Sequence, residues 1–245
     1  MPVAVTHQTP LAGTRAVVTG ASRGVGEAIA RALAGAGARV ALVARGKEAL
    51  DRIAGSLGRH GVSVPCDLSD AGAVAAVLEA IPQRLDGVPT LLVNCAGVFP
   101  FAPMHELTDT QLSDAIAANL VAPFRFIRGM LPAMRAAGTG HIVTIGSVAD
   151  RTVFAENGAY AATKFGARAM HEVLRLETRG SGVRATLVSP GPTDTAMWDL
   201  LNPDSRSDLP NRDQMLRADD VARAVLFAVT QPASVNIDEL RLSRS

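Results

Sequence analysis

The 245-residue sequence is poor in several residue types: it holds two cysteines, one tyrosine, one tryptophan and only two lysines among its 24 basic residues. Two cysteines cannot form a disulfide framework, which predicts a reduced, cytoplasmic setting. A net charge of +1 excludes a broad electrostatic footprint for nucleic acid. The five histidines contain no H-x-x-x-H pair, so we expect no zinc site and no other metal.

Long hydrophobic runs are also missing. No stretch approaches the roughly 20 apolar residues of a membrane span, so we expect no membrane association. The start of the chain has no basic segment followed by an apolar block, so we do not interpret it as a secretory signal. We expect residues 1–13 to form a loose tail before the first strand.

Short runs rich in valine and isoleucine alternate with longer segments of helical period, which predicts βαβ units and a parallel sheet buried on both faces. We therefore expect one doubly wound α/β domain over residues 1–245. The expected strands lie in 15–20, 38–44, 61–67, 89–97, 140–147, 183–191 and 235–242, and the expected helices near 24–36, 47–58, 70–83, 109–136, 158–179 and 219–230. One long segment, 195–216, breaks this rhythm, and we interpret it as a lid over the substrate.

A glycine-rich turn follows the first expected strand, in "VVTGASRGVGEAIARAL" (17–33). Gly20 permits a tight turn, Gly24 lets the backbone approach a phosphate, and Gly26 lets the helix pack closely on the strand. The helix N-terminus then offers free N–H groups and a positive dipole end to a pyrophosphate. The spacing is G-x3-G-x-G rather than G-x-G-x-x-G, but its place in the alternating pattern favours a dinucleotide site over an ordinary tight turn.

The end of the second expected strand indicates which dinucleotide binds. An acidic residue there typically holds the ribose hydroxyl of NAD, but here Arg45 follows Ala44 and no acid appears before Glu48. Arg45 and Arg23 together suit a 2′-phosphate, which favours NADP over NAD. The alternative is that both are ordinary surface arginines. Asp67 is expected to accept from the adenine amino group or to cap the following helix, and one residue could serve both roles.

The single tyrosine lies four positions before one of the two lysines, in "YAATK" (160–164). Because positions i and i+4 share a helix face, Tyr160 and Lys164 are expected to project together. An ammonium about 6 Å away favours the phenolate by roughly 3 kcal/mol, which suits Tyr160 to exchange a proton with a carbonyl or alcohol oxygen. Ser147, at the end of the fifth strand, is a candidate donor to the same oxygen. Its surroundings, I-G-S-V-A, lack the glycines of a hydrolase nucleophile elbow.

These motifs resemble the short-chain dehydrogenase/reductase family, in its compact single-domain branch with a Rossmann-type fold. The resemblance runs from about residue 13 to 242 and includes "TGASRGVG" (19–26), "NCAG" (94–97), "YAATK" (160–164) and "PGPTDT" (190–195). It implies Ser147, Tyr160 and Lys164 as the catalytic set, with Asn119 holding a water that links Lys164 to solvent. Lys164 is also expected to bond the nicotinamide ribose.

Two positions depart from the family pattern: Cys95 replaces an asparagine, and Thr193 stands where the pattern has an apolar residue. Thr195 fits the threonine that would hold the nicotinamide carboxamide. The residues expected to bind the cofactor are Gly20, Ser22, Arg23, Gly24, Val25, Gly26, Arg45, Asp67, Leu68, Asn94, Ala96, Gly97, Tyr160, Lys164, Pro190, Gly191, Thr193 and Thr195.

The family resemblance implies an NADP-dependent enzyme that interconverts a carbonyl and a secondary alcohol, built as a homotetramer or dimer on the helices near 109–136 and 158–179. A 3-oxoacyl-thioester (acyl-carrier-protein) reductase and a small 3-hydroxy acid dehydrogenase both remain open as the specific activity. A cofactor-sensing binding protein without chemistry is a third possibility, although it would be expected to lose Tyr160 or Lys164. The side chains expected to line the substrate pocket are Phe99, Val148, Val153, Phe154, Met197 and Trp198.

Overall fold

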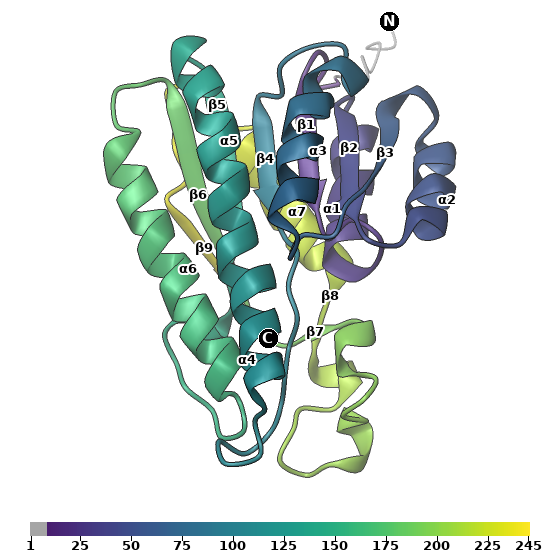
Figure 1. The fold of residues 1–245 in the computed structure, drawn as a ribbon, viewed down its shortest axis with the longest axis vertical. Helices are drawn as coiled ribbons and strands as arrows, with labels where there is room; N and C mark the ends of the chain where they lie inside the picture. The colour runs from purple at the N-terminus through teal and green to yellow at the C-terminus, as the bar shows by residue number, and fades with distance from the viewer. Residues whose placement is uncertain (1–8) are drawn as a thin grey trace, which may run out of the picture.

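The computed structural model describes residues 9–245, which form a seven-stranded parallel sheet with helices on both faces (Figure 1). The strand order is β3-β2-β1-β4-β5-β6-β9, and each pairing is parallel. The α/β class and the doubly wound sheet predicted from the sequence are confirmed. The strands are β1 (Arg15–Thr19), β2 (Arg39–Ala44), β3 (Gly61–Pro65), β4 (Leu91–Asn94), β5 (Gly140–Ile145), β6 (Val183–Pro190) and β9 (Glu239–Leu242). The helices are α1 (Gly24–Gly35), α2 (Lys47–Leu57), α3 (Ala71–Arg84), α4 (Asp109–Ile116), α5 (Ala122–Ala136), α6 (Gly158–Glu177) and α7 (Ala218–Val229).

The sheet separates two apolar cores. Alternate residues of one strand enter opposite cores. Val18 of β1 belongs to the core that includes residues of α1, α2 and α7, and Val17 belongs to the core that includes residues of α3, α5 and α6. Both side chains are fully buried. Because both faces are covered, the strands read as continuous hydrophobic runs rather than as an alternating pattern.

The path of the chain creates a crevice beside β1. From β1, the chain first adds β2 and then β3 on one side of the sheet. It then returns and places β4 on the other side of β1. Helices leave this point in opposite directions, so the carboxyl ends of β1 and β4 open onto a gap in which α/β proteins bind ligands. The segment after β6 lies at the same end of the molecule (Figure 1).

Three details differ from the sequence prediction. The expected helix 109–136 is two helices, α4 and α5, separated by a π-helical turn at Ala117–Val121. The segment 195–216 contains three short 3₁₀ turns, and it is framed by a two-stranded pairing of β7 (Thr193–Asp194) with β8 (Leu216–Arg217). Residues 1–8 of the expected tail lie outside the described residues, but residues 9–13 are not loose, since Leu11 is buried in the core and its N–H donates to Ala36.

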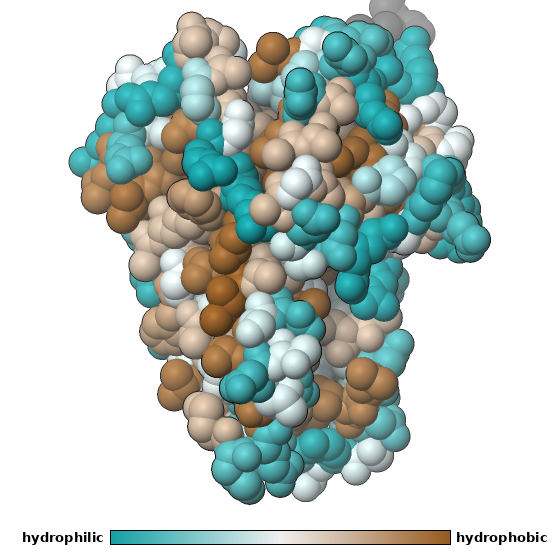
Figure 2. Space-filling model, in the orientation of Figure 1, coloured by the Kyte–Doolittle hydropathy of each residue, from teal (hydrophilic) through white to brown (hydrophobic). Residues whose placement is uncertain are grey.

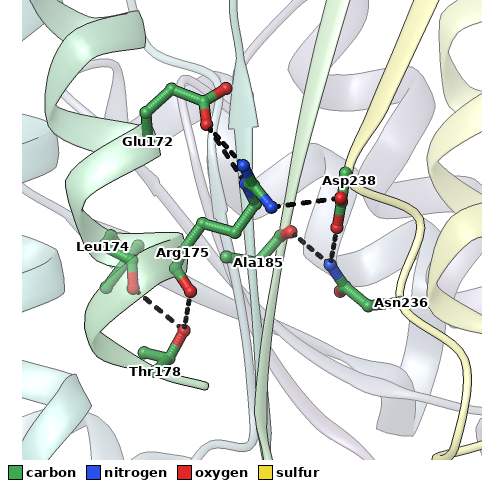
Figure 3. Close-up of polar contacts among 7 residues, drawn as sticks. All are labelled: Glu172, Leu174, Arg175, Thr178, Ala185, Asn236 and Asp238. Atoms are coloured by element: carbon green, nitrogen blue, oxygen red, sulfur yellow. Dashed lines mark hydrogen bonds and ion pairs between the residues drawn. The ribbon is translucent and has the colours of Figure 1, made fainter.

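Polar contacts hold the approach to the edge strand β9 against α6 (Figure 3). Arg175 of α6 donates to Glu172 on its own helix and to Asp238, at 3.0 and 3.1 Å. Asn236 donates to the carbonyl oxygen of Ala185 in β6 at 3.1 Å. The C-terminal strand is therefore anchored both to its neighbour in the sheet and to the helix that carries Tyr160.

Large hydrophobic side chains are exposed on α4, α5 and α6, and Figure 2 shows hydrophobic surface on the side where α5 and α6 lie. These side chains are Leu112, Ile116, Phe124, Phe165, Val173 and Leu176. Within residues 9–245, no helix combines the length and the apolar character needed to cross a membrane.

Candidate active site

The glycine turn joins β1 to α1 at the crevice. Gly20 has a φ of +71°, and a Cβ atom there would lie 2.7 Å from the Cα of Ala96. A Cβ at Gly26 would lie 2.2 Å from the carbonyl oxygen of Gly20. Both positions therefore require glycine, as the sequence predicted. No side chain caps the N-terminus of α1, which leaves its N–H groups available to an anion.

A single cleft of about 1020 Å³ runs from this turn past the ends of β4, β5 and β6. It is lined by all of the residues expected to bind the cofactor except Asn94. Asn94 is buried in β4 and its side-chain amide has no partner within the described part of the chain. The neighbouring "NCAG" backbone is instead held by Thr19, whose hydroxyl accepts the N–H groups of Cys95 and Ala96 at 3.0 and 3.2 Å.

Two arginines stand at one end of the cleft. Arg23 and Arg45 both line it and are exposed, and neither side chain forms a hydrogen bond within residues 9–245. Asp67, nearby, accepts both the hydroxyl and the N–H of Ser69 at 2.7 and 3.0 Å. These two bonds, and to a smaller extent the charge of Arg45, lower the pKa of the Asp67 carboxyl group. The interpretation of Asp67 as a helix cap is wrong, since Asp70 caps α3.

Tyr160 and Lys164 lie one turn apart on α6, and both line the cleft. The Nζ atom of Lys164 is 5.5 Å from the centre of the Tyr160 ring. Lys164 is 6% exposed, and its Nζ donates to the carbonyl oxygen of Ile145 at 2.9 Å. The phenol ring meets the ring of Phe99 edge-on, with centres 4.8 Å apart. The sequence prediction that the two side chains project together therefore agrees with their positions.

Ser147 follows β5 and lines the cleft with Tyr160 and Lys164. Its Oγ accepts the N–H of Ala149 at 3.1 Å, which leaves the hydroxyl hydrogen free to donate. Its own N–H donates to the carboxylate of Asp150 at 3.2 Å. The turn that carries Ser147 is thus held by two hydrogen bonds, one that Ser147 accepts and one that it donates.

Asp150 is the centre of a polar network beneath this turn. It is fully buried and accepts the hydroxyl of Ser189 at 2.5 Å and the Nε of Arg151 at 2.8 Å. Arg151 also pairs with Glu239 of β9 at 2.5 Å. The serine turn is therefore tied through one buried carboxylate to β6 and β9.

Asn119 lies in the π-helical turn and is 2% exposed. Its side chain accepts the N–H of Val98 at 2.8 Å and donates to the carbonyl oxygen of the same residue at 2.9 Å. It also donates to Thr163, whose hydroxyl donates to the carbonyl oxygen of Tyr160. Asn119 does not line the cleft, but it joins the loop after β4 to the first turns of α6.

Thr193 and Thr195 lie at the start of the segment after β6. Thr193 uses its hydroxyl to donate to the carbonyl oxygen of Gly191 at 3.0 Å, and its own carbonyl accepts from the indole of Trp198 at 3.1 Å. Thr195 faces the glycine turn, because its Cγ2 would lie 3.3 Å from a Cβ placed on Gly24. The polar residue at 193 therefore closes the local turn, which an apolar side chain would not do.

The substrate end of the cleft contains five of the six side chains expected there. Val153 is the exception: it is 73% exposed and lines a separate pocket of about 550 Å³. The sequence reasoning missed Phe101, Glu156 and Asp208, which also line the cleft. These residues come from three separate segments of the chain, and only the fold brings them together, so no local sequence pattern marks them. Other lining residues that were missed include Ala44, Gly46, Ala49, Ser69, Asp114, Asn157, Leu209 and Pro210.

Comparison with known proteins identifies the class. The family model described as short chain dehydrogenase matches residues 14–206, and the chain belongs to this family of oxidoreductases. Over 95% of its length it is 33% identical to an uncharacterised oxidoreductase of Staphylococcus aureus, and it covers 97% of that protein. Over 94% of its length it is 38% identical to the glycine betaine reductase ATRR of Emericella nidulans, but it spans only 19% of that larger protein.

A solved structure is similar across the whole fold. The crystal structure of a metagenomic short-chain oxidoreductase in complex with NADP has a TM-score of 0.83 and 35% identity to this chain. The match covers 96% of this chain and 99% of that one.

The buried network beneath Ser147 predicts a large effect of Asp150→Asn on stability. An amide cannot accept all three donors of Asp150 and leaves Arg151 with a single carboxylate partner. Breaking a buried pair from one side costs about 3 kcal/mol or more. Urea unfolding is expected to show this loss. Arg175→Ala, which removes contacts to the more exposed Glu172 and Asp238, is expected to cost under about 1 kcal/mol. Equal, small losses in the two variants would contradict the interpretation.

Proposed function

We propose that the protein interconverts a carbonyl and a secondary alcohol with NADP as the hydride carrier and Tyr160 as the general acid and base. The observation that carries this proposal is the meeting of Tyr160, Lys164 and Ser147 on the wall of the cleft that begins at the glycine turn. The NADP complex of the similar metagenomic oxidoreductase supports the choice of cofactor.

The cofactor end of the cleft fits a dinucleotide with a 2′-phosphate. The uncapped N-terminus of α1 suits the pyrophosphate. The guanidinium groups of Arg23 and Arg45, which have no side-chain hydrogen bond in the described part of the chain, suit the additional phosphate. Asp67 has an oxygen available to the adenine amino group. Lys164 is proposed to bond the nicotinamide ribose, and Thr195 the carboxamide.

The proposed mechanism uses the hydroxyl groups of Tyr160 and Ser147. Bound NADPH supplies the hydride. Tyr160 donates its proton to the carbonyl oxygen during reduction and accepts one from the alcohol during oxidation. Ser147 donates a hydrogen bond to the same oxygen, where negative charge develops. The ammonium of Lys164 lies 5.5 Å from the centre of the phenol ring, where its positive charge stabilises the negative charge that develops on the phenol oxygen during proton transfer.

Three supporting roles belong to the same proposal. Asn119 is proposed to hold a water that returns protons to Lys164, while its side chain fixes Val98 and Thr163. Residues 195–216 are proposed to close over the substrate as a lid within the single domain 1–245. The setting is proposed to be cytoplasmic, as the scarcity of cysteine indicates.

The substrate class is open between a 3-oxoacyl thioester, a small 3-hydroxy acid and other alcohols. The carboxylates of Glu156 and Asp208 on the cleft wall disfavour a small acid. The name of the relative glycine betaine reductase points to a fourth class, compounds with a quaternary ammonium group. A cofactor sensor without chemistry is disfavoured by the presence of Tyr160 and Lys164. The sensor alternative would be favoured if the protein bound the cofactor but turned over none of a panel of ketones, 3-oxo acids and 3-oxoacyl thioesters.

Tyr160→Phe keeps the ring that packs on Phe99 but removes the transferable proton. Turnover is expected to fall by about 10² to 10⁴, while the Kd for NADPH changes less than about twofold. NADPH oxidation and fluorescence titration measure the two quantities, with thermal melting as a control for folding. If cofactor affinity fell as much as turnover, the role given to Tyr160 would be wrong.

Arg45→Asp is expected to shift cofactor preference toward NADH, because it replaces a phosphate partner with a charge that repels phosphate. The ratio of kcat/KM for NADPH to that for NADH should fall at least about tenfold. Arg52→Asp makes the same charge change on the exposed side of α2, away from the cleft, and should leave the ratio unaltered. An unaltered ratio in Arg45→Asp would refute the 2′-phosphate assignment.

The exposed hydrophobic side chains of α4, α5 and α6 are proposed to be covered in a homodimer or homotetramer. Light scattering on the purified protein is expected to give two or four times the monomer mass. Phe124→Asp, which puts a charge on this surface without disturbing a buried site, should shift the mass toward the monomer. A monomeric native protein would contradict the proposal.

A further inference from the structure

Four aromatic rings meet at the substrate end of the cleft. The ring of Phe99 lies in the middle, with its centre 4.8 Å from that of Tyr160, 5.3 Å from Trp198 and 5.6 Å from Phe101. All four side chains line the cleft. The space beside the proposed proton donor is therefore bordered by aromatic rings contributed by the loop after β4 and by the segment after β6.

Two carboxylates line the same end of the cleft, and both hold one arginine. Arg206 donates to Asp208 at 2.7 and 3.1 Å and to Glu156 at 3.3 Å. Its guanidinium carbon lies 5.2 Å from the centre of the Phe101 ring. One cation on an aromatic face is thus already held by two carboxylates, and the three groups together carry a net charge of −1.

Arg206 itself does not line the cleft, whereas Glu156, Asp208 and Phe101 do. The two carboxylates therefore contact Arg206 on one side and border the cleft on the other. Each carboxylate can accept more hydrogen bonds than Arg206 donates to it. A second positive group can approach them from within the cleft while Arg206 stays in place.

A substrate carboxylate finds no comparable partner at this end. The cations that line the cleft are Arg23, Arg45 and Lys164. The two arginines flank the glycine turn, at the opposite end of the cleft, and Lys164 is bonded to Ile145 beneath Tyr160. An anionic substrate would therefore approach two carboxylates without a free cation to hold it.

We propose that the substrate carries a quaternary ammonium group close to the reacting carbon. This group lies against the rings of Phe99, Phe101 and Trp198, near the carboxylates of Glu156 and Asp208. Aromatic faces attract such cations through the ring quadrupole, more strongly where water is excluded, and the carboxylates add charge attraction. The inference rests on the proposed oxidoreductase function and names the substrate class of that site.

Three secondary alcohols that share the group CH2–CH(OH)–CH3 test the charge alone. They are (2-hydroxypropyl)trimethylammonium, the neutral 4,4-dimethylpentan-2-ol of the same shape, and 3-hydroxybutanoate. Oxidation with NADP+ is followed by the appearance of NADPH. The kcat/KM of the ammonium alcohol is expected to exceed that of the neutral alcohol about tenfold, mainly through KM, and that of 3-hydroxybutanoate by more.

Asp208→Asn removes a carboxylate with little change in shape, and it should reduce the ratio between the ammonium and the neutral alcohol about tenfold. Asp213→Asn makes the same substitution in the same segment, at an exposed residue that does not line the cleft. It should leave the ratio unaltered. Equal effects of the two variants would overturn the inference.

The outcomes separate the inference from the proposed function. Oxidation of the neutral alcohol or of 3-hydroxybutanoate with a kcat/KM equal to that of the ammonium alcohol, or higher, would overturn the inference alone. The same holds if the protein oxidises other secondary alcohols but not these three. A protein that binds NADP and oxidises no alcohol would end the proposed function, and the inference with it.

Discussion

The burial of one lysine determines how this site is built. Lys164 is almost completely covered, and a buried ammonium is tolerated only where its donors are satisfied. Within residues 9–245, its Nζ donates to one acceptor, the carbonyl oxygen of Ile145 at the end of β5. An ammonium has three donors, so two remain for the cleft that Lys164 lines. This bond also ties α6, the helix that carries Tyr160, to the end of β5.

A polar network joins the turn after β5, the carboxyl end of β6 and the first residue of β9. Ser147 follows β5, Ser189 lies near the end of β6, and Glu239 begins β9; Asp150 and Arg151 join all three. A buried charged network is weak evidence for stability, because desolvation opposes the attraction. Here it holds the turn that carries Ser147, the proposed donor to the reacting oxygen. Gly146 leaves the space that the network needs, since a Cβ there would lie 2.5 Å from Asp150.

The sequence was sufficient to predict the features that depend on local spacing. Alternating runs predicted the strands, three glycines predicted the turn, and the i, i+4 spacing placed Tyr160 with Lys164. Features that depend on distant contacts were missed. The π-helical turn at Ala117–Val121 has no local signal, and neither has the buried role of Asp150, whose partner Ser189 is 39 residues away. Asp67 and Asp70 are both plausible helix caps by spacing, and only the position of the helix start distinguishes them.

The net charge of +1 conceals an uneven distribution along the cleft. The guanidinium groups of Arg23 and Arg45, which form no hydrogen bond within residues 9–245, stand at the glycine turn. Two carboxylates that share one arginine stand at the aromatic end. Such a distribution orients a molecule with separated charges. The arginine end attracts a dinucleotide with an extra phosphate, and the negative charge at the other end suits the positively charged substrate proposed above. Because interactions in a cleft are screened less than those on an open surface, this local arrangement determines selectivity more than the overall charge does.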